Sequence, residues 1–259
     1  MNELQSLEQQ LQTIFHANSG MEDMSWKDSM KGLLFDLSSF LRRSANAFRK
    51  PLAVAELGPA KGIEQRKNYM DVMSTYIVTP DGFQGNMNEF ITELGNSLAS
   101  LNKLAERDLV EFNKWLSKVI STGALEVGSA PNLKGYAEQQ VALKTFITDK
   151  PTSVTFGQAY SSLGALPTAV EDFNQVVRTV KTTAPSQFLR LIERADELSD
   201  ILYKLMESGE VNLGDATGNK FVAERLLDLA RVSTFAGMVF ALASQTAVSL
   251  TETSKRIAK

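Results

Sequence analysis

The longest apolar stretch of the chain lies near its C-terminus, within Asn219–Lys259. No charged residue occurs between Arg231 and Glu252, and the apolar residues of Val232–Leu250 do not keep to one narrow helical stripe. A helix that is apolar on most sides is buried by protein or placed in lipid. We therefore expect this stretch to be the central helix of a helical domain, with Phe235, Val239 and Leu242 in the core.

Seven further stretches repeat apolar residues every three or four positions, which is the spacing of one helix face. They are Asn2–His16, Ser25–Phe48, Pro59–Ile77, Asn88–Ser121, Tyr136–Phe146, Pro167–Lys181 and Ser186–Glu207. Asn88–Ser121 is the longest, and as one continuous helix it would be on the order of 50 Å long. The turn Thr79–Gly82 should end the third stretch, since glycine supplies a positive φ. A short strand at Tyr76–Val78 is the alternative there, although no strand partner is evident.

These patterns predict an all-α protein, an elongated multi-helix bundle of about seven to nine helices around the hydrophobic C-terminal helix. Residues 123–135 contain three glycines and a proline and form the best linker. The chain would then divide into an N-terminal helical half, residues 1–122, and a C-terminal helical half, residues 136–259. One continuous domain is the alternative.

The amino-acid composition limits the kinds of binding site and reaction that this chain can support. Apolar residues make up 43% of the chain and charged residues 22%, as in ordinary soluble proteins, and the net charge is −3. The absence of cysteine removes disulfides and thiolate chemistry, and the single histidine, His16, removes multi-histidine metal sites. We therefore expect no catalytic residues, no cofactor and no metal site. The N-terminal stretch has no apolar signal core, so we expect no secretion by that route.

A basic segment, residues 42–67, stands out in this acidic chain. Its cations Arg42, Arg43, Arg49, Lys50, Arg66 and Lys67 are the candidate partner contacts. They could grip an acidic protein surface or neutralise phosphates, but nucleic acid is the weaker reading because only Phe48 is interleaved for stacking. The competing interpretation is a solvated helix end, where cations are favourable.

Two other clusters have plain structural interpretations. Glu193, Asp196, Glu197 and Asp200 form an acidic stripe on one helix face, which could bind a cation or a basic partner but is also where a solvated face is expected. Residues Gly214–Lys220 resemble a phosphate loop without the required Gly-Lys-Ser/Thr spacing, and we read them as a helix cap.

The apolar run near the C-terminus is long enough to cross a bilayer. The seven serine, threonine and glutamine residues between Arg231 and Glu252 make this stretch only mildly hydrophobic. We therefore favour the core helix of a soluble bundle over a membrane-inserting helix.

Long helices without a catalytic constellation favour a non-enzymatic structural or assembly protein, for example a component of a virion or another large complex. It would act through helix-mediated contacts with other proteins or with itself, in the cytoplasm or within a virion. The first alternative is a membrane-active, pore-forming type of protein that uses Val232–Leu250. The second is an enzyme or regulatory binder that uses the basic segment or the acidic stripe.

Overall fold

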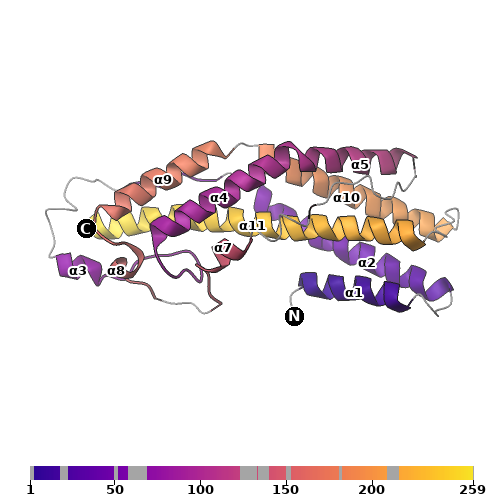
Figure 1. The fold of residues 1–259 in the computed structure, drawn as a ribbon, viewed down its shortest axis with the longest axis horizontal. Coiled ribbons are helices and arrows are strands. Elements are labelled where there is room, and N and C mark those ends of the chain that lie inside the picture. The colour runs from indigo at the N-terminus through magenta and orange to yellow at the C-terminus, as the bar shows by residue number, and fades with distance from the viewer. Residues whose placement is uncertain are drawn as a thin grey trace. The chain divides into compact units, whose positions relative to one another are not determined.

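The computed structural model describes residues 3–17, 23–49, 52–57, 69–122, 133, 140–149, 153–180, 183–208 and 216–258, and it confirms the all-α prediction (Figure 1). The elements are α1 (Glu3–Ala17), α2 (Asp23–Ser44), η1 (Ala45–Phe48), α3 (Tyr69–Met73), α4 (Met87–Glu106), α5 (Asp108–Thr122), α7 (Gln140–Lys144), α8 (Phe156–Ala159), α9 (Ala165–Thr179), α10 (Thr183–Ser208) and α11 (Ala216–Ala258). In these ranges, β-pairing is limited to two isolated bridges.

The chain forms two compact units, each built from three separate stretches. Unit 1 comprises Met1–Arg49, Lys103–Ala137 and Thr183–Gly237, and unit 2 comprises Lys50–Asn102, Glu138–Thr182 and Met238–Lys259. The units are therefore interleaved along the chain, whereas the sequence suggested two consecutive halves. The linker expected at residues 123–135 lies outside the described residues except for Leu133, so it stays a prediction.

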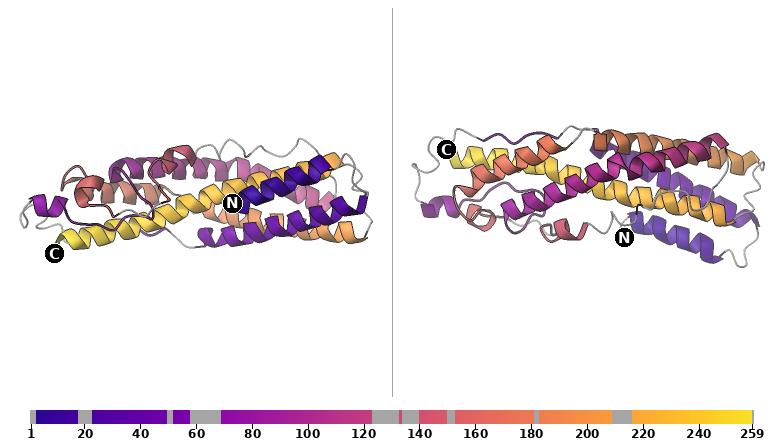
Figure 2. Two further views of the ribbon diagram at one scale, coloured as in Figure 1. Left: turned by 90° about the horizontal axis from the view of Figure 1, so that it is seen from below. Right: turned by 45° about the horizontal axis from the view of Figure 1, so that its top comes forward.

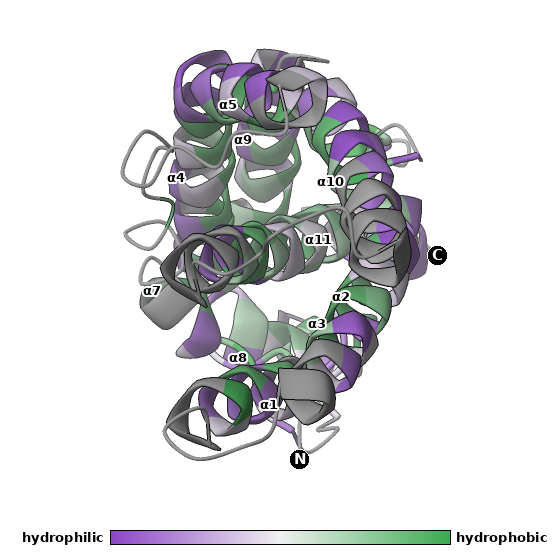
Figure 3. Ribbon diagram, turned by 90° about the vertical axis from the view of Figure 1, so that its right-hand side faces the viewer, coloured by the Kyte–Doolittle hydropathy of each residue, from purple (hydrophilic) through white to green (hydrophobic). Residues whose placement is uncertain are grey.

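Unit 1 is a set of packed helices in which α10 contacts α2, η1 and α5, and α1 contacts α2. Figures 1 and 2 both show α10 beside α2. Its core includes the rings of Phe48 and Phe188, which stack with centroids 4.9 Å apart. In Figure 3, α5 and α10 carry hydrophilic residues on their outer sides and hydrophobic residues toward the interior of the unit. The helical periodicity of the sequence thus corresponds to burial on one side.

The prediction of one continuous helix over Asn88–Ser121 is wrong. The chain makes a turn at Arg107, so α4 ends at Glu106 and α5 begins at Asp108. The Arg107 Nε donates to Asp108 Oδ1 at 2.7 Å, and the Asp108 carboxylate lies in the first turn of α5, where the helix dipole favours an anion. Apolar residues recur at helical spacing on both sides of this turn, so the periodicity does not indicate the break.

Helix α11 spans 43 residues and contributes to both units. In unit 1, Phe235 is buried, and in unit 2, Val239 and Leu242 are buried. Several of its hydroxyls bond to the carbonyl four residues earlier, as Thr246 does to Leu242 at 2.6 Å. This local bonding allows polar side chains to lie in an apolar interior.

In unit 2, the turn before α4 forms as its sequence predicts. Phe83 N–H donates to Pro80 O at 3.0 Å, and Gly82 takes a φ of +70°. A Cβ on Gly82 would stand 2.2 Å from the Thr148 carbonyl oxygen, so the position requires glycine for space as well as for φ.

The helix expected over Pro59–Ile77 is described only as α3, Tyr69–Met73, because residues 58–68 lie outside the described part of the chain. After α3, the extended segment that was the alternative at Tyr76–Val78 does pair with another part of the chain. Tyr76 forms an isolated antiparallel bridge with Thr155, and Ile77 N–H donates to Val154 O at 3.0 Å. This partner is about 80 residues away in sequence, so no local pattern indicates it.

Candidate protein-contact surface

One face of α2 in unit 1 is largely exposed, although Gln10 of α1 donates to Asp36 Oδ2 at 3.4 Å and Arg42 binds Asp196 of α10. Its members, called here the α2 stripe, are Asp28, Gly32, Phe35, Asp36, Ser39, Arg42 and Arg43; all are exposed except Ser39, which is half-buried. They recur at intervals of three and four residues and therefore lie along one side of the helix. The opposite side of α2 is buried and includes Leu33, Leu37 and Leu41.

A groove of about 560 Å³ runs beside this stripe. Its lining includes Leu34 and Phe35 as apolar residues, with Lys31, Asp36, Arg42 and Asp200 as charged ones. Leu34 is buried, whereas 69% of Phe35 is exposed. The groove therefore combines an accessible aromatic ring with charges of both signs.

The basic segment and the acidic stripe meet at this groove. Arg42 Nε donates to Asp196 Oδ1 at 2.8 Å, and the Ser38 hydroxyl donates to the same oxygen. The hydrogen bond to Asp196, together with the charge of that carboxylate, raises the pKa of Arg42 above its ordinary value. Arg42 thus joins α2 to α10 while 59% of its side chain stays exposed. Two clusters that the sequence offered as separate binding surfaces are partly each other's partners.

The remaining cations of the basic segment are only partly described. Arg43 is exposed in the last turn of α2, and Arg49, just after η1, donates to Asn46 Oδ1 at 3.4 Å. Lys50, Arg66 and Lys67 lie outside the described residues. The structure therefore brings two of the six candidate contacts, Arg42 and Arg43, into the α2 stripe.

The acidic stripe divides between structural and exposed roles. Asp196 binds Arg42, Glu197 accepts a hydrogen bond from Arg194 at 3.2 Å, and Asp200 borders the groove. Glu193 is exposed. Within the described residues, no group of three or more His, Cys, Asp or Glu side chains could hold a metal ion.

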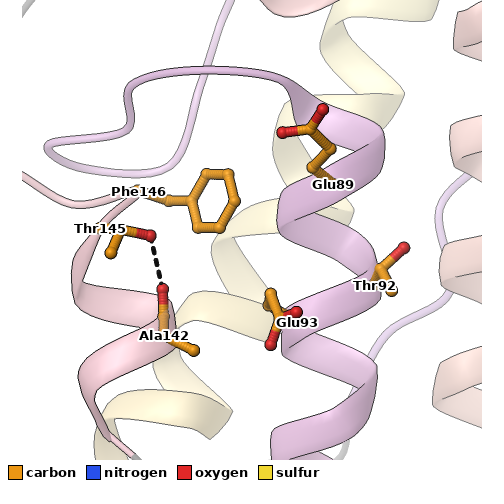
Figure 4. A pocket seen from close by; sticks show the side chains of 6 residues that line it. All are labelled: Glu89, Thr92, Glu93, Ala142, Thr145 and Phe146. Atoms are coloured by element: carbon orange, nitrogen blue, oxygen red, sulfur yellow. Dashed lines mark hydrogen bonds between the residues drawn. The ribbon is translucent and has the colours of Figure 1, made fainter.

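A second groove, of about 470 Å³, lies in unit 2 between α4 and the end of α7 (Figure 4). Glu89, Thr92 and Glu93 line it from α4, while Thr145 and Phe146 face them from beyond α7. The Thr145 hydroxyl donates to Ala142 O at 2.7 Å. The lining thus presents two carboxylates, Glu89 and Glu93, and two hydroxyls, Thr92 and Thr145.

Sequence reasoning missed a buried charge network in unit 1. Asp228 lies between Arg225 and Arg231 on α11, with carboxylate–guanidinium distances of 3.2 and 2.8 Å, and Arg231 Nε also reaches Glu8 of α1 at 2.8 Å. The three residues on α11 are spaced by three, which places them on one helix face. That spacing is the only sign in the sequence, and it does not indicate that Asp228 is 1% exposed.

The polar residues of the apolar run also have partners that the sequence does not reveal. In unit 2, Gln245 exchanges hydrogen bonds with Asp81, at 2.8 Å to its carboxylate and 3.2 Å from its backbone amide. Ser249 and Thr253 donate to Val78 O at 2.6 and 3.2 Å. These side chains recur every four residues on α11 and hold the segment before α4 against one helix face.

Among the described residues, one helical segment, Ala223–Ile257, has the length and mean hydropathy, 1.6, to cross a membrane, and 72% of its most apolar window is buried. The buried core helix of a soluble protein passes the same test, so this is weak support for a membrane role. No family model, curated protein or solved structure matches this chain. The fold and surface define only a class of protein: an all-α protein with a groove that is lined by charged and aromatic residues of α2 and by Asp200 of α10.

Proposed function

We propose that this chain is a non-enzymatic structural or assembly protein that acts through helix-mediated protein contacts, with the α2 stripe as a contact surface. The observation that carries the proposal is Phe35, which is 69% exposed in the middle of α2 and borders a groove with a charged rim. Aromatic and arginine side chains at such a groove are typical of residues that dominate binding energy.

An enzymatic role has less support. Asp196, beside the groove along α2, is the ion-pair partner of Arg42 and accepts a hydrogen bond from Ser38, which is a structural use of this carboxylate. A location in the cytoplasm or within a virion remains part of the proposal, and it depends on the assembly role.

The test places a photo-activated cross-linking amino acid at Phe35 in the full chain. The matched control carries it at Met70 of unit 2, whose side chain is also 69% exposed. Both are illuminated in an extract of the native cells, and adduct masses are compared. We expect one discrete adduct of fixed stoichiometry from position 35. Unlabelled parent protein should compete for the same site and reduce this adduct, whereas the unlabelled Phe35→Ser variant should not.

Adducts that are diffuse and the same at both positions would contradict the proposal. They would mean that Phe35 meets other proteins only by collision, as any exposed apolar side chain does. A discrete adduct from position 35 supports it, whether the captured chain is this protein or a different one.

A further inference from the structure

The middle of α2 contains a glycine for which unit 1 offers no packing reason. Gly32 is exposed, and no neighbouring segment of the described chain lies within 4 Å of the position that a Cβ would take there. Glycine in a helix interior destabilises the helix relative to alanine. The open space above Gly32 lies one turn from the exposed ring of Phe35 and in the same groove.

The α2 stripe is also polarised in charge. Asp28 lies at its N-terminal end and Arg42 and Arg43 lie at its C-terminal end, while Lys31 and Asp36 carry opposite charges on either side of Gly32 and Phe35 in the sequence. A surface that is acidic at one end and basic at the other complements itself when two copies run in opposite directions. In a parallel pair, the same surface would place like charges opposite each other.

We propose that the occupant of this surface is the α2 stripe of a second copy of the chain, packed antiparallel about a two-fold axis. This inference rests on the proposed function and names the partner of the same surface. Phe35 of each copy fills the open space above Gly32 of the other. A two-fold pairing of one surface with itself is the usual architecture of homodimers, and each contact then occurs twice.

This register fixes the other pairs. With Phe35 over Gly32, Asp28 lies opposite Ser39 of the second copy, and Lys31 lies opposite its Asp36. The acidic start of each stripe is then about one helical turn from Arg42 and Arg43 of the other copy. Small side chains at Gly32 and Ser39 allow the two helix axes to approach closely.

A single pair of helices makes a small interface, so the dimer should dissociate on dilution. Its mass is measured by sedimentation and light scattering over a range of protein and salt concentrations. We expect the parent chain to dimerise, and more weakly at high salt because the rim charges are screened. Phe35→Ser and Gly32→Leu should each leave a monomer, while Met70→Ser should dimerise like the parent.

The Gly32→Leu variant distinguishes loss of the dimer interface from damage to the fold. Leucine is a better helix former than glycine, and the space above Gly32 is open in the isolated unit. The thermal midpoint of the monomeric variant should therefore equal or exceed that of the diluted parent. Loss of dimer together with a lower midpoint would point to damage of the fold and would contradict the open site on which the inference rests.

Orientation is tested by cysteine pairing, for which the chain offers a clean background because it contains no cysteine. A mixture of Asp28→Cys and Ser39→Cys chains should form a disulfide-linked dimer on mild oxidation. Each variant alone should not, since its two sulfurs would be offset by about 16 Å along the helix axes, beyond disulfide reach. Met70→Cys serves as the control for random collision.

The outcomes separate this inference from the proposed function. Linkage within Asp28→Cys alone, or Ser39→Cys alone, would indicate a parallel pair and overturn the antiparallel arrangement. A monomer at every concentration, with a discrete adduct between position 35 and a different protein, would overturn the second copy and leave the proposed function standing. A monomer without a discrete adduct would overturn both.

Discussion

Tyr160 shows how much a single buried polar atom matters in unit 2. Its side chain is 1% exposed and its ring stacks on Phe156 with centroids 4.7 Å apart, yet its hydroxyl has no hydrogen-bond partner among the described residues. Burial raises the pKa of this hydroxyl because the phenolate would lose its hydration. The packing of the ring stabilises the unit, while the unpaired hydroxyl opposes it.

We expect Tyr160→Phe to keep the ring packing and to raise the free energy of unfolding at neutral pH by up to ~1–3 kcal/mol. Burial sets the folded pKa of Tyr160 above its unfolded value of ~10. As the pH rises above that value, the tyrosine ionises more readily in the unfolded chain than in the folded one, and the free energy of unfolding falls. The parent should therefore lose more stability between neutral and strongly alkaline pH than the variant. Urea unfolding at both pH values measures the difference.

The matched control is Tyr76→Phe, because Tyr76 is 62% exposed. It should leave the free energy of unfolding at neutral pH unchanged, because its hydroxyl is not buried. If Tyr160→Phe is destabilising, the hydroxyl has a partner outside the described residues or a bound water, and the account of its burial is wrong.

At the scale of elements, α11 is held by polar contacts as well as by apolar packing. In unit 1, the network of Arg225, Asp228 and Arg231 extends to Glu8 on α1. In unit 2, Gln245, Ser249 and Thr253 bind the segment before α4. Directional bonds of this kind fix the rotation of a helix that is apolar on most sides, which non-directional burial does not.

Asp228→Ala should strongly destabilise unit 1. It leaves the buried Arg225 and the half-buried Arg231 without their shared carboxylate, and breaking a buried ion pair by removing one partner costs about 3–5 kcal/mol. Glu8→Ala removes only the half-exposed end of the same network and should cost less than ~1 kcal/mol. Urea unfolding of both variants against the parent measures the two losses.

Equal and small losses in the two variants would contradict a structural role for Asp228. A loss of stability in Asp228→Ala but not in Glu8→Ala would show that the ion pairs within α11 supply most of the stabilisation from this network. The double variant then tests coupling, because residues in one network should not act additively.

At the scale of the whole molecule, the apolar run of α11 distinguishes the two leading functions. Its most apolar window is mostly buried, so insertion into lipid would require the core around it to open. Insertion would also break the bonds of Ser249 and Thr253 to Val78 and leave polar groups in hydrocarbon. Both costs favour the soluble assembly protein over the membrane-active alternative.

We therefore expect the parent chain to release no dye from liposomes, and Val239→Asp to lower its thermal midpoint sharply. Val239 is 0% exposed, and an unpaired charge there is expensive. The matched control is Val248→Asp on the same helix, since Val248 is 58% exposed and the charge stays in water. Robust dye release by the parent, lost in Val239→Asp, would favour the membrane-active function instead.

The fold class, most helices and the core of α11 follow from local patterns in the sequence. Helix periodicity is a local property, because residues three and four apart share a face whatever the rest of the chain does. The turn at Gly82 is predicted equally well, since its positive φ belongs to a turn formed by neighbouring residues. The break at Arg107 is not predicted by this periodicity, because the apolar spacing continues through it.

The contacts between residues far apart in the sequence depend on tertiary packing. Arg42 and Asp196 are 154 positions apart, and Arg231 and Glu8 are 223 apart. No local pattern encodes such pairs, because they depend on which helix faces pack together. The α2 stripe became a candidate surface for the same reason: packing covers the other faces of α2 and leaves the one with Phe35 and Gly32 open.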